Sequence, residues 1–437
     1  MPFWNKEIET ISLSALENLQ LTSLRRTMVQ AAKAPFYNRL FSERKIGPDS
    51  IQGLADLRLL PLTSKDDLRA VPPTDFLAVP QEKVVRLHAS SGTTGTPTAV
   101  FHTQNDLDAW TELTARCLCM VGLTPADVFQ NMVGYGLFTG GLGMHYGAER
   151  LGATVIPSGV GASRRQINLM KQFHTTAMHI IPSYALKLLE TLAELSLDPR
   201  ESLELRLAVV GAEPHSEGAR QRIEEAYGIS AYNCYGLSEM NGPGVAFECP
   251  EKTGLHLWED SFLVEILDPV TLEPAPPGQV GEVVLTTLRR EAMPLLRYRT
   301  KDLARLLPGP CPCGRPHRRL SRLKGRTDDM LILKGVNIFP IQVEKVLAPL
   351  PETNANYLII LEKEGPVDAM TVCVEMSEAF SRETPEALQK TAARIADLLR
   401  DEILISPKVE LAAPGALPSS EGKAVRVLDK RPREEEN

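Results

Sequence analysis

Short apolar runs alternate with amphipathic segments between about residues 84 and 300, and this alternation restricts the fold more than any other feature. The apolar runs have the length of buried strands, whereas the amphipathic segments have the length and periodicity of helices. Such an alternation predicts α/β layers with mostly parallel strands. The predicted strands are 83–89, 153–157, 177–181 and 206–210, and the predicted helices are 105–119, 164–172, 184–195 and 218–227.

The flanking regions follow other patterns. The first 60 residues predict helices with a break at Ala34-Pro35. Residues 260–307 form short runs split by Pro and Gly, which predicts an antiparallel or barrel-like piece. Beyond Gly325 the pattern predicts strands at 330–333, 355–361 and 370–376 and helices at 340–350 and 384–403.

These patterns predict an α/β protein of two domains. A large N-terminal α/β domain with parallel sheets and a barrel-like piece would cover residues 1–325. A small C-terminal α+β domain would follow and cover 329–437. At about 110 residues the C-terminal domain has an ordinary size.

Composition excludes several classes of protein. The 437 residues contain 48 Lys and Arg against 55 Asp and Glu, a net charge of -7, whereas nucleic-acid binding needs a basic face. Seven cysteines are too few for a disulfide framework and are typical of a reducing compartment. The N-terminus has no basic and apolar segments of a signal peptide. We therefore expect a cytoplasmic protein that does not bind nucleic acid.

Residues 128–148 contain no Asp, Glu, Lys or Arg and are long enough to span a membrane. Six glycines interrupt the stretch, together with Gln130, Asn131 and His145. The interruptions favour a buried loop over a membrane span, so no membrane partner is expected.

A loop of glycines and hydroxyl residues, SSGTTGTP at 90–97, follows the strand predicted at 83–89. Backbone N–H groups and hydroxyls in such a loop can surround phosphate oxygens. The loop is not a Walker A motif, because the terminal Lys-Ser/Thr pair is absent. A flexible turn is the alternative interpretation.

This loop and several segments along the chain resemble the acyl-adenylate-forming enzymes, the superfamily of acyl-CoA synthetases and adenylation domains. Within the superfamily the chain is similar to the phenylacetate–CoA ligase family. The segments that carry the resemblance are LPLTSKDDLR (60–69), HASSGTTGTPT (88–98), YGLFTGGLGMHYGAERLGA (135–153), GAEP (211–214), YGLSEMNGPGVAFEC (235–249), GLHLWED (254–260), PLLRYRTKDL (294–303), GRTDDMLILKGVNIFP (325–340) and SEGKAVRV (420–427).

The resemblance implies a two-step reaction with ATP, Mg²⁺ and coenzyme A. A carboxylate attacks the α-phosphate of ATP and releases pyrophosphate, and the thiol of coenzyme A then displaces AMP from the acyl-adenylate. Phenylacetate is the expected substrate. Alternatives are another aryl acid such as indoleacetate or a hydroxyaryl acid, a cofactor adenylated without coenzyme A, or a nucleotide-binding regulatory protein without turnover. We expect small-molecule substrates as partners, and a homodimer.

The resemblance places the phosphates on the glycine-rich loop and Mg²⁺ on Glu239, and one protein carboxylate is chemically sufficient for that ion. The family often has lysine where this chain has Thr96, so one cation near the phosphates is missing. The loop residues implied are Ser90, Ser91, Gly92, Thr93, Thr94 and Gly95.

Nucleotide recognition is implied for a turn after the strand at 206–210 and for residues after the next predicted strand. Both segments would lie at the carboxyl ends of parallel strands, where α/β ligand crevices lie. Asp302 matches the aspartate of the family that binds ribose. Without the resemblance it would be interpreted as an Asx cap in a turn. The residues of the two segments are Gly211, Ala212, Glu213, Pro214, Asn233, Cys234, Tyr235 and Gly236.

The resemblance also implies a hinge at 326–328 and a C-terminal domain, 329–437, that moves about it. Arg326 would reach the nucleotide and Asp328 would be the pivot. Lys423 would enter for adenylation and offset the negative charge of the transition state. Lys334, Gly335 and Val336 would line the coenzyme A side for the second step.

The acyl pocket is expected where glycines lie beside aromatic residues, because a flat ring needs a slot. The segment contains no Arg or Lys, so a second acidic group on the substrate is not expected. An ordinary glycine-rich core loop is the alternative. The pocket residues are Tyr135, Gly136, Phe138, Gly140, Gly141 and Pro243.

A structural zinc site is a further hypothesis. Cys311 and Cys313 form a C-x-C motif, and Cys249 supplies a third thiol. His256 is the first choice for the fourth ligand and His317 is the alternative. Free buried thiols are the competing interpretation.

Overall fold

The computed structural model describes residues 2–90, 97–333, 336–364, 367–418 and 425–431, and it describes residues 355, 364 and 367 by their backbone alone. The chain packs into two compact units. The first contains residues 1–159, 175–179 and 232–323, and the second contains residues 160–174, 180–231 and 324–437. The second unit thus combines the predicted C-terminal domain with two segments from the middle of the chain.

The first unit begins with helices α1 (Lys6–Glu9), α2 (Leu13–Ala31) and α3 (Pro35–Arg44). Ser12 caps α2, and α3 starts at a proline, whose fixed φ suits a first helical position. The predicted break at Ala34-Pro35 is confirmed. The following short elements are η1 (Pro48–Ser50), η2 (Leu54–Leu59), α4 (Lys65–Ala70), η3 (Pro73–Phe76) and η4 (Gln81–Lys83).

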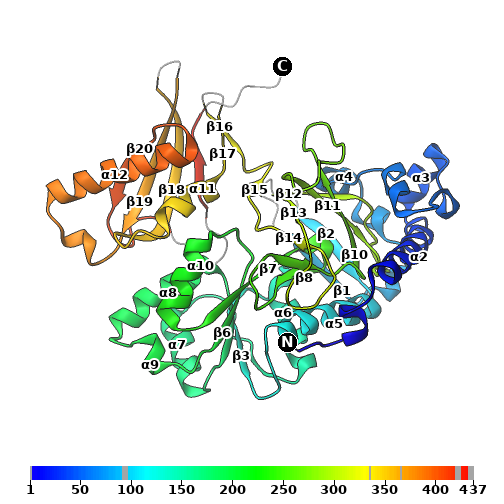
Figure 1. Ribbon diagram of the computed structural model, residues 1–437, viewed down its shortest axis with the longest axis horizontal. Coiled ribbons are helices and arrows are strands. Elements are labelled where there is room, and N and C mark those ends of the chain that lie inside the picture. Colours follow the sequence, from blue (N-terminus) through cyan, green and yellow to red (C-terminus); the bar gives the residue numbers. More distant parts are fainter. Residues whose placement is uncertain (1, 91–96, 334–335, 365–366, 419–424, 432–437) are drawn as a thin grey trace. The chain divides into compact units, whose positions relative to one another are not determined.

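The predicted parallel strands are confirmed for part of the first unit. Strand β3 (Val128–Asn131) pairs in parallel with β4 (Thr154–Ile156) and with β5 (Ala177–Ile180). The strands that follow are antiparallel: β7 (Ser230–Leu237) pairs with β8 (Gly242–Glu248), β8 with β9 (Leu255–Leu257), β9 with β14 (Arg319–Leu320), and β14 with β13 (Leu306–Leu307). Helices α5 (Gln104–Met120) and α6 (Thr139–Leu151) lie against β8 (Figure 1).

One prediction for this unit is confirmed in part, and one is wrong. The strand predicted at 83–89 is β1 (Arg86–Ser90), which pairs antiparallel with β2 (Thr98–His102) in a separate two-stranded sheet. The stretch 128–148 is not a buried loop, because it contains β3 and most of helix α6. A Cβ atom at Gly143 would lie 2.4 Å from the Trp110 ring, so the glycines let α5 and α6 approach closely. No helix in the described part of the chain is long and apolar enough to cross a membrane.

The region 260–307 contains the predicted antiparallel piece. Strand β11 (Gly281–Thr287) pairs antiparallel with β10 (Phe262–Leu267) and with β12 (Tyr298–Ala304). A bulge interrupts the pairing of β11 and β12, and Lys301 there has a φ of 67°. A residue at a bulge can adopt this left-handed conformation, which favours glycine. In this chain Lys301 adopts it.

The second unit contains the remaining predicted strands and helices. Its C-terminal sheet has the order β20-β19-β18-β21, in which β18 and β19 are antiparallel and both outer pairs are parallel. Helix α12 covers this sheet (Figure 1), with Ile395 and Leu399 in the same core as Val372. The bounds are α7 (Ser163–Gln172), α8 (Pro182–Glu194), α9 (Pro199–Ser202), β6 (Leu207–Val210), α10 (Glu217–Tyr227), β15 (Gly325–Arg326), β16 (Leu331–Leu333), β17 (Val336–Ile338), α11 (Pro340–Leu347), β18 (Thr353–Glu364), β19 (Val367–Met376), η6 (Phe380–Arg382), α12 (Pro385–Ile403), β20 (Lys408–Ala412) and β21 (Val427–Asp429).

Candidate active site

Two residues predicted to bind the nucleotide meet in the first unit. The hydroxyl of Tyr235 on β7 donates to Oδ2 of Asp302 on β12 at 2.7 Å, and both residues are buried. Two local predictions need correction. Residues 233–236 lie inside β7 rather than after a strand, and Asp302 lies in β12 rather than in a turn. The hydrogen bond fixes one carboxylate oxygen of Asp302.

Glu239 lies in the short helix η5 (Ser238–Met240), directly after β7, and is 4% exposed. Its Oε1 lies 3.7 Å from Nζ of Lys65, at the start of α4. Arg290 stabilises this turn, because its guanidinium donates to the Glu239 carbonyl at 3.5 Å and to Oδ1 of Asn241 at 2.5 Å. A buried carboxylate held in this way is a suitable ligand for a hard cation.

The turn after β6 carries the first predicted nucleotide segment, in the second unit. Ala212 has a φ of 71°, and Oε1 of Glu213 accepts a hydrogen bond from the backbone N–H of Ser183 at 2.8 Å. Ser183 is in the first turn of α8, where unpaired N–H groups favour a negative charge. This hydrogen bond stabilises the turn. The role of the turn in nucleotide binding stays a prediction.

Glu344 on α11 lies near Glu213 in the same unit. Its Oε1 accepts from the backbone N–H of Ser216, the N-cap of α10, at 2.8 Å. Burial raises the pKa of Glu344 to about 7 from an ordinary 4.5, and the charge of Glu213 adds to the rise. The folded state therefore holds this proton more tightly than the unfolded chain does.

Because the folded pKa is raised, this group stabilises the fold fully below pH 4.5 and loses that contribution as the pH rises towards 7. We expect Glu344→Gln, which keeps an acceptor for Ser216, to stabilise the unit above pH 7 by about 2–3 kcal/mol and to have little effect at pH 4.5. Melting curves at pH 5 and pH 8 test this, with the exposed Glu383→Gln as control. An E344Q benefit that is equal at both pH values would contradict the prediction.

The hinge residues are also brought together. The Arg326 guanidinium donates to both carboxylate oxygens of Asp328, each at 2.9 Å, and the pair is partly exposed. Val336 lies half-buried in β17. The predicted residues Ser91, Gly92, Thr93, Thr94, Gly95, Lys334, Gly335 and Lys423 lie outside the described residues.

The predicted acyl segment is organised by Asn131, a residue that the sequence interpretation did not assign to the site. Its Nδ2 donates to the hydroxyl of Tyr135 at 2.9 Å and to the carbonyl of Gly141 at 2.7 Å. Asn131 is the last residue of β3, and a buried amide at a strand end was the signal for its role. Burial raises the pKa of Tyr135 to about 12, so its hydroxyl stays protonated.

Gly141 has no room for a side chain, since a Cβ atom would lie 2.5 Å from the Gly134 carbonyl oxygen. At Gly136 a Cβ atom would meet no heavy atom within 4 Å. We expect Gly141→Ala to displace the segment, to destabilise the protein by about 1–3 kcal/mol and to raise the KM of the acid substrate. Gly53→Ala is the control, because a Cβ atom there also meets no heavy atom within 4 Å and Gly53 lies outside the predicted acyl segment. Steady-state kinetics and melting curves test the pair, and equal effects of both variants would contradict the prediction.

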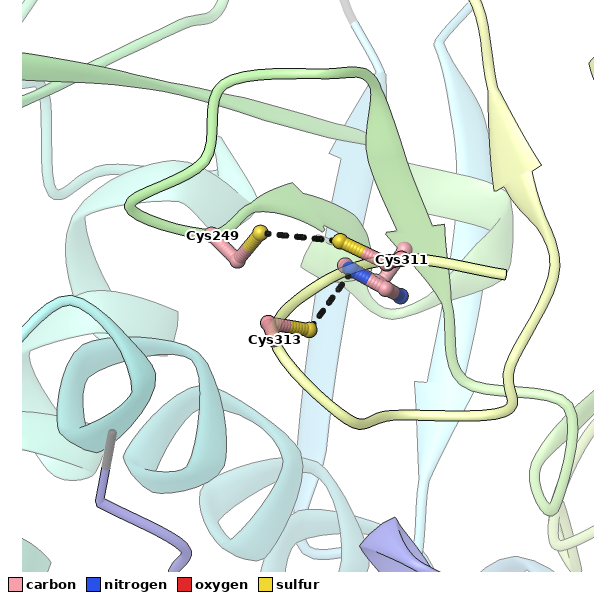
Figure 2. Close-up of side chains that lie close together, drawn as sticks. Cys249, Cys311 and Cys313 are labelled. Carbon is pink, nitrogen blue, oxygen red and sulfur yellow. Dashed lines mark hydrogen bonds between the residues drawn. The ribbon is translucent and has the colours of Figure 1, made fainter. Parts of the chain in front are cut away.

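The four residues predicted as zinc ligands converge in the first unit. The ligand atoms of Cys249, His256, Cys311 and Cys313 all lie within 4.8 Å of one another, and all four residues are buried. Figure 2 shows the side chains of the three cysteines close together, with 3.7 Å between the sulfurs of Cys249 and Cys311. Nε2 of His256 lies 3.3 Å from the sulfur of Cys313.

The orientation of His256 separates the two candidates for the fourth position. Its Nδ1 lies 3.1 Å from the carbonyl oxygen of His317, so Nδ1 donates there and Nε2 faces the thiols. The His317 ring instead contacts the carbonyl of Ile8. Hydrogen bonding with Cys249, and then with His256, lowers the pKa of Cys313. A thiol poised to ionise among two thiols and an imidazole nitrogen fits a tetrahedral zinc ion.

Comparison with known families places the chain in a class. A family model described as "AMP-binding enzyme" matches residues 18–288, and "AMP-binding enzyme C-terminal domain" matches residues 335–431. The class is therefore that of the AMP-binding enzymes.

Similar proteins narrow the class. The phenylacetate-coenzyme A ligase of Thermus thermophilus is 45% identical, covering 98% of this chain and 99% of its own. That of Pseudomonas putida is 46% identical and covers 97% of this chain and 96% of its own length. That of Escherichia coli is 44% identical and covers 97% of both chains. The chain belongs to the phenylacetate-coenzyme A ligase family.

Solved structures agree with this placement. A crystal structure of 2-hydroxyisobutyryl-CoA ligase in the postadenylation state with 2-HIB-AMP has a TM-score of 0.92 and 30% identity, covering 98% of this chain and 92% of that one. A benzoate CoA ligase from Burkholderia xenovorans has a TM-score of 0.61 at 17% identity, covering 79% of this chain and 68% of that one, and shows the shared fold alone. The predicted α/β fold class is confirmed.

Proposed function

We propose that the protein activates phenylacetate as an acyl-adenylate with ATP and transfers the acyl group to coenzyme A. AMP and pyrophosphate are the other products. The observation that carries the proposal is 44–46% identity, over nearly the whole chain, to four proteins named phenylacetate-coenzyme A ligase.

The first step forms a bond between a carboxylate oxygen and the α-phosphorus, and breaks the bond to pyrophosphate. Glu239 would hold Mg²⁺, which neutralises phosphate charge during this step. Asp302, oriented by Tyr235, would accept hydrogen bonds from the ribose hydroxyls. Lys423 would offset charge on the reacting carboxylate and phosphate.

In the second step the sulfur of coenzyme A attacks the acyl carbon and AMP leaves. The C-terminal segment would move about residues 326–328 between the two steps, and Val336 would then face the thiol side together with Lys334 and Gly335. The pairing of Arg326 with Asp328 supports a role at the pivot, since a partly exposed ion pair can exchange partners at low cost.

The acyl segment supports an uncharged aromatic group. Tyr135 presents a protonated hydroxyl held by Asn131, and residues 128–148 contain no Arg or Lys to pair with a second acid. Shape decides between ring substituents there, at about 1–3 kcal/mol per methylene.

We also propose a structural zinc ion at Cys249, His256, Cys311 and Cys313, a cytoplasmic location and a homodimer. The small number of cysteines, seven in 437 residues, supports a reducing compartment. When bound, zinc would tie the β8–β9 hairpin to the loop at 311–313.

A panel of acids tests the substrate. AMP release would be measured with and without coenzyme A for phenylacetate, its hydroxy derivatives, indoleacetate, benzoate and short fatty acids. We expect a coenzyme A-dependent reaction that is fastest with phenylacetate. AMP release that needs no coenzyme A would indicate another acceptor, and ATP binding without AMP release from any acid would favour the regulatory alternative.

A further inference from the structure

Lys65 extends its ammonium group to the carboxylate that is proposed to bind magnesium. Nζ of Lys65 lies 3.7 Å from Oε1 of Glu239, and the side chains are 32% and 5% exposed, respectively. The lysine therefore lies at the accessible side of a buried acid. The two residues are 174 positions apart in the sequence, so the fold alone brings them together.

The backbone of Lys65 is held on a rigid support. Ser64 caps α4 in a reciprocal capping box with Asp67, with 2.7 Å between the Ser64 nitrogen and the Asp67 carboxylate. Thr63 is buried and pairs with β12: its N–H donates to the Arg297 carbonyl at 3.0 Å, and the Arg299 N–H donates to the Thr63 carbonyl at 2.8 Å. The strand that positions Lys65 thus also carries Asp302.

Arg290 also contacts Glu239, but through the backbone. It is buried, and its guanidinium is committed to the Asn241 side chain and to the Phe101 carbonyl, besides the Glu239 carbonyl. It contacts the backbone of Glu239, whereas Lys65 contacts the carboxylate. Lys65 is partly exposed and lies beside the proposed metal ligand. A residue that binds a charged ligand at this site needs both properties.

The triphosphate of ATP is a suitable partner for the ammonium group of Lys65. The triphosphate carries more negative charge than one Mg²⁺ neutralises, and the glycine-rich loop has the uncharged Thr96 where a cation could have contributed. A magnesium ion held by Glu239 would supply the counter-charge that Lys65 now supplies to this carboxylate. The ammonium group of Lys65 would then be available to bind phosphate oxygens.

We propose that Lys65 binds the β- and γ-phosphate oxygens of ATP, and the pyrophosphate that leaves. This inference rests on the proposed function. AMP lacks these phosphates, so its affinity does not depend on Lys65.

Titration calorimetry with ATP, pyrophosphate and AMP in the presence of Mg²⁺ tests the assignment on the full chain. We expect Lys65→Ala to weaken ATP and pyrophosphate binding on the order of tenfold or more, and to leave AMP binding unchanged. Lys65→Arg should recover part of the loss, because it keeps the charge. The control is Lys83→Ala, an exposed lysine of the same unit.

A second comparison separates phosphate contact from support of Glu239. In the Glu239→Gln background the carboxylate charge is gone, so a further loss of ATP affinity on Lys65→Ala reports the phosphate contact itself. No further loss, or an equal loss of ATP and AMP affinity, would overturn the proposal. Acid-dependent AMP formation by the unmodified protein is measured separately and tests the proposed function. If the protein forms AMP but Lys65→Ala does not change its ATP affinity, this inference fails and the proposed function stands.

Discussion

Lys423→Ala is expected to slow adenylation by about 10²–10³-fold while sparing thioester formation from pre-made phenylacetyl-adenylate. The reason is that the ammonium group would stabilise charge that develops only when the carboxylate attacks the α-phosphate. The second step has no such charge on the phosphorus. Pyrophosphate exchange would measure the first step, and thioester formation from the synthetic adenylate would measure the second.

The matched control is Lys390→Ala, an exposed lysine on α12 in the same part of the chain. It should change neither step. If Lys423→Ala slowed both steps equally, the account of a C-terminal segment that presents different groups in the two steps would fail.

Removal of the proposed zinc ion should have the second large effect. Elemental analysis should find one zinc ion per chain, and Cys313→Ser should lose it. Because a structural zinc ion stabilises the folded chain directly, we expect the first unit to melt about 5–10 °C lower in this variant. Cys119→Ser, a half-buried cysteine outside the cluster, should retain both zinc and stability.

The loop that carries Cys311 and Cys313 also holds the N-terminal segment. Arg315 is buried and pairs with the buried Glu9 at 2.7 Å. Metal loss should therefore expose Lys6 in α1 to trypsin, and N-terminal sequencing of the fragments would report it. A protein that contains no zinc as purified and binds none on titration would contradict the metal assignment.

Much of the fold could be predicted because local patterns and tertiary packing agree. Helices α5, α7, α8, α10 and α12 follow the predicted ranges closely, since each carries an apolar stripe that becomes buried. The pairing of strand β1 could not be predicted, because an apolar run does not specify its partner, and the following strand β2 supplies one. Residues 233–236 were misplaced because β7 extends through them.

The candidate site was predictable in its residue types and less so in its contacts. The cysteine spacing and His256 identified the cluster of three thiols and one imidazole, and ring orientation, which no spacing reveals, distinguishes His256 from His317. The roles of Lys65 and Arg290 depend on long-range contacts to the Glu239 turn. The segment LPLTSKDDLR contained Lys65, and only the structure showed which carboxylate it meets.

The central claim is that a carboxylate of the acid attacks the α-phosphate of ATP. A reaction with phenylacetate labelled with ¹⁸O at both carboxyl oxygens, ATP and coenzyme A tests this directly. Mass spectrometry of the products shows where the label goes. The account predicts one ¹⁸O atom in each AMP molecule and none in pyrophosphate. AMP without label, or release of ADP and labelled phosphate, would contradict an acyl-adenylate intermediate.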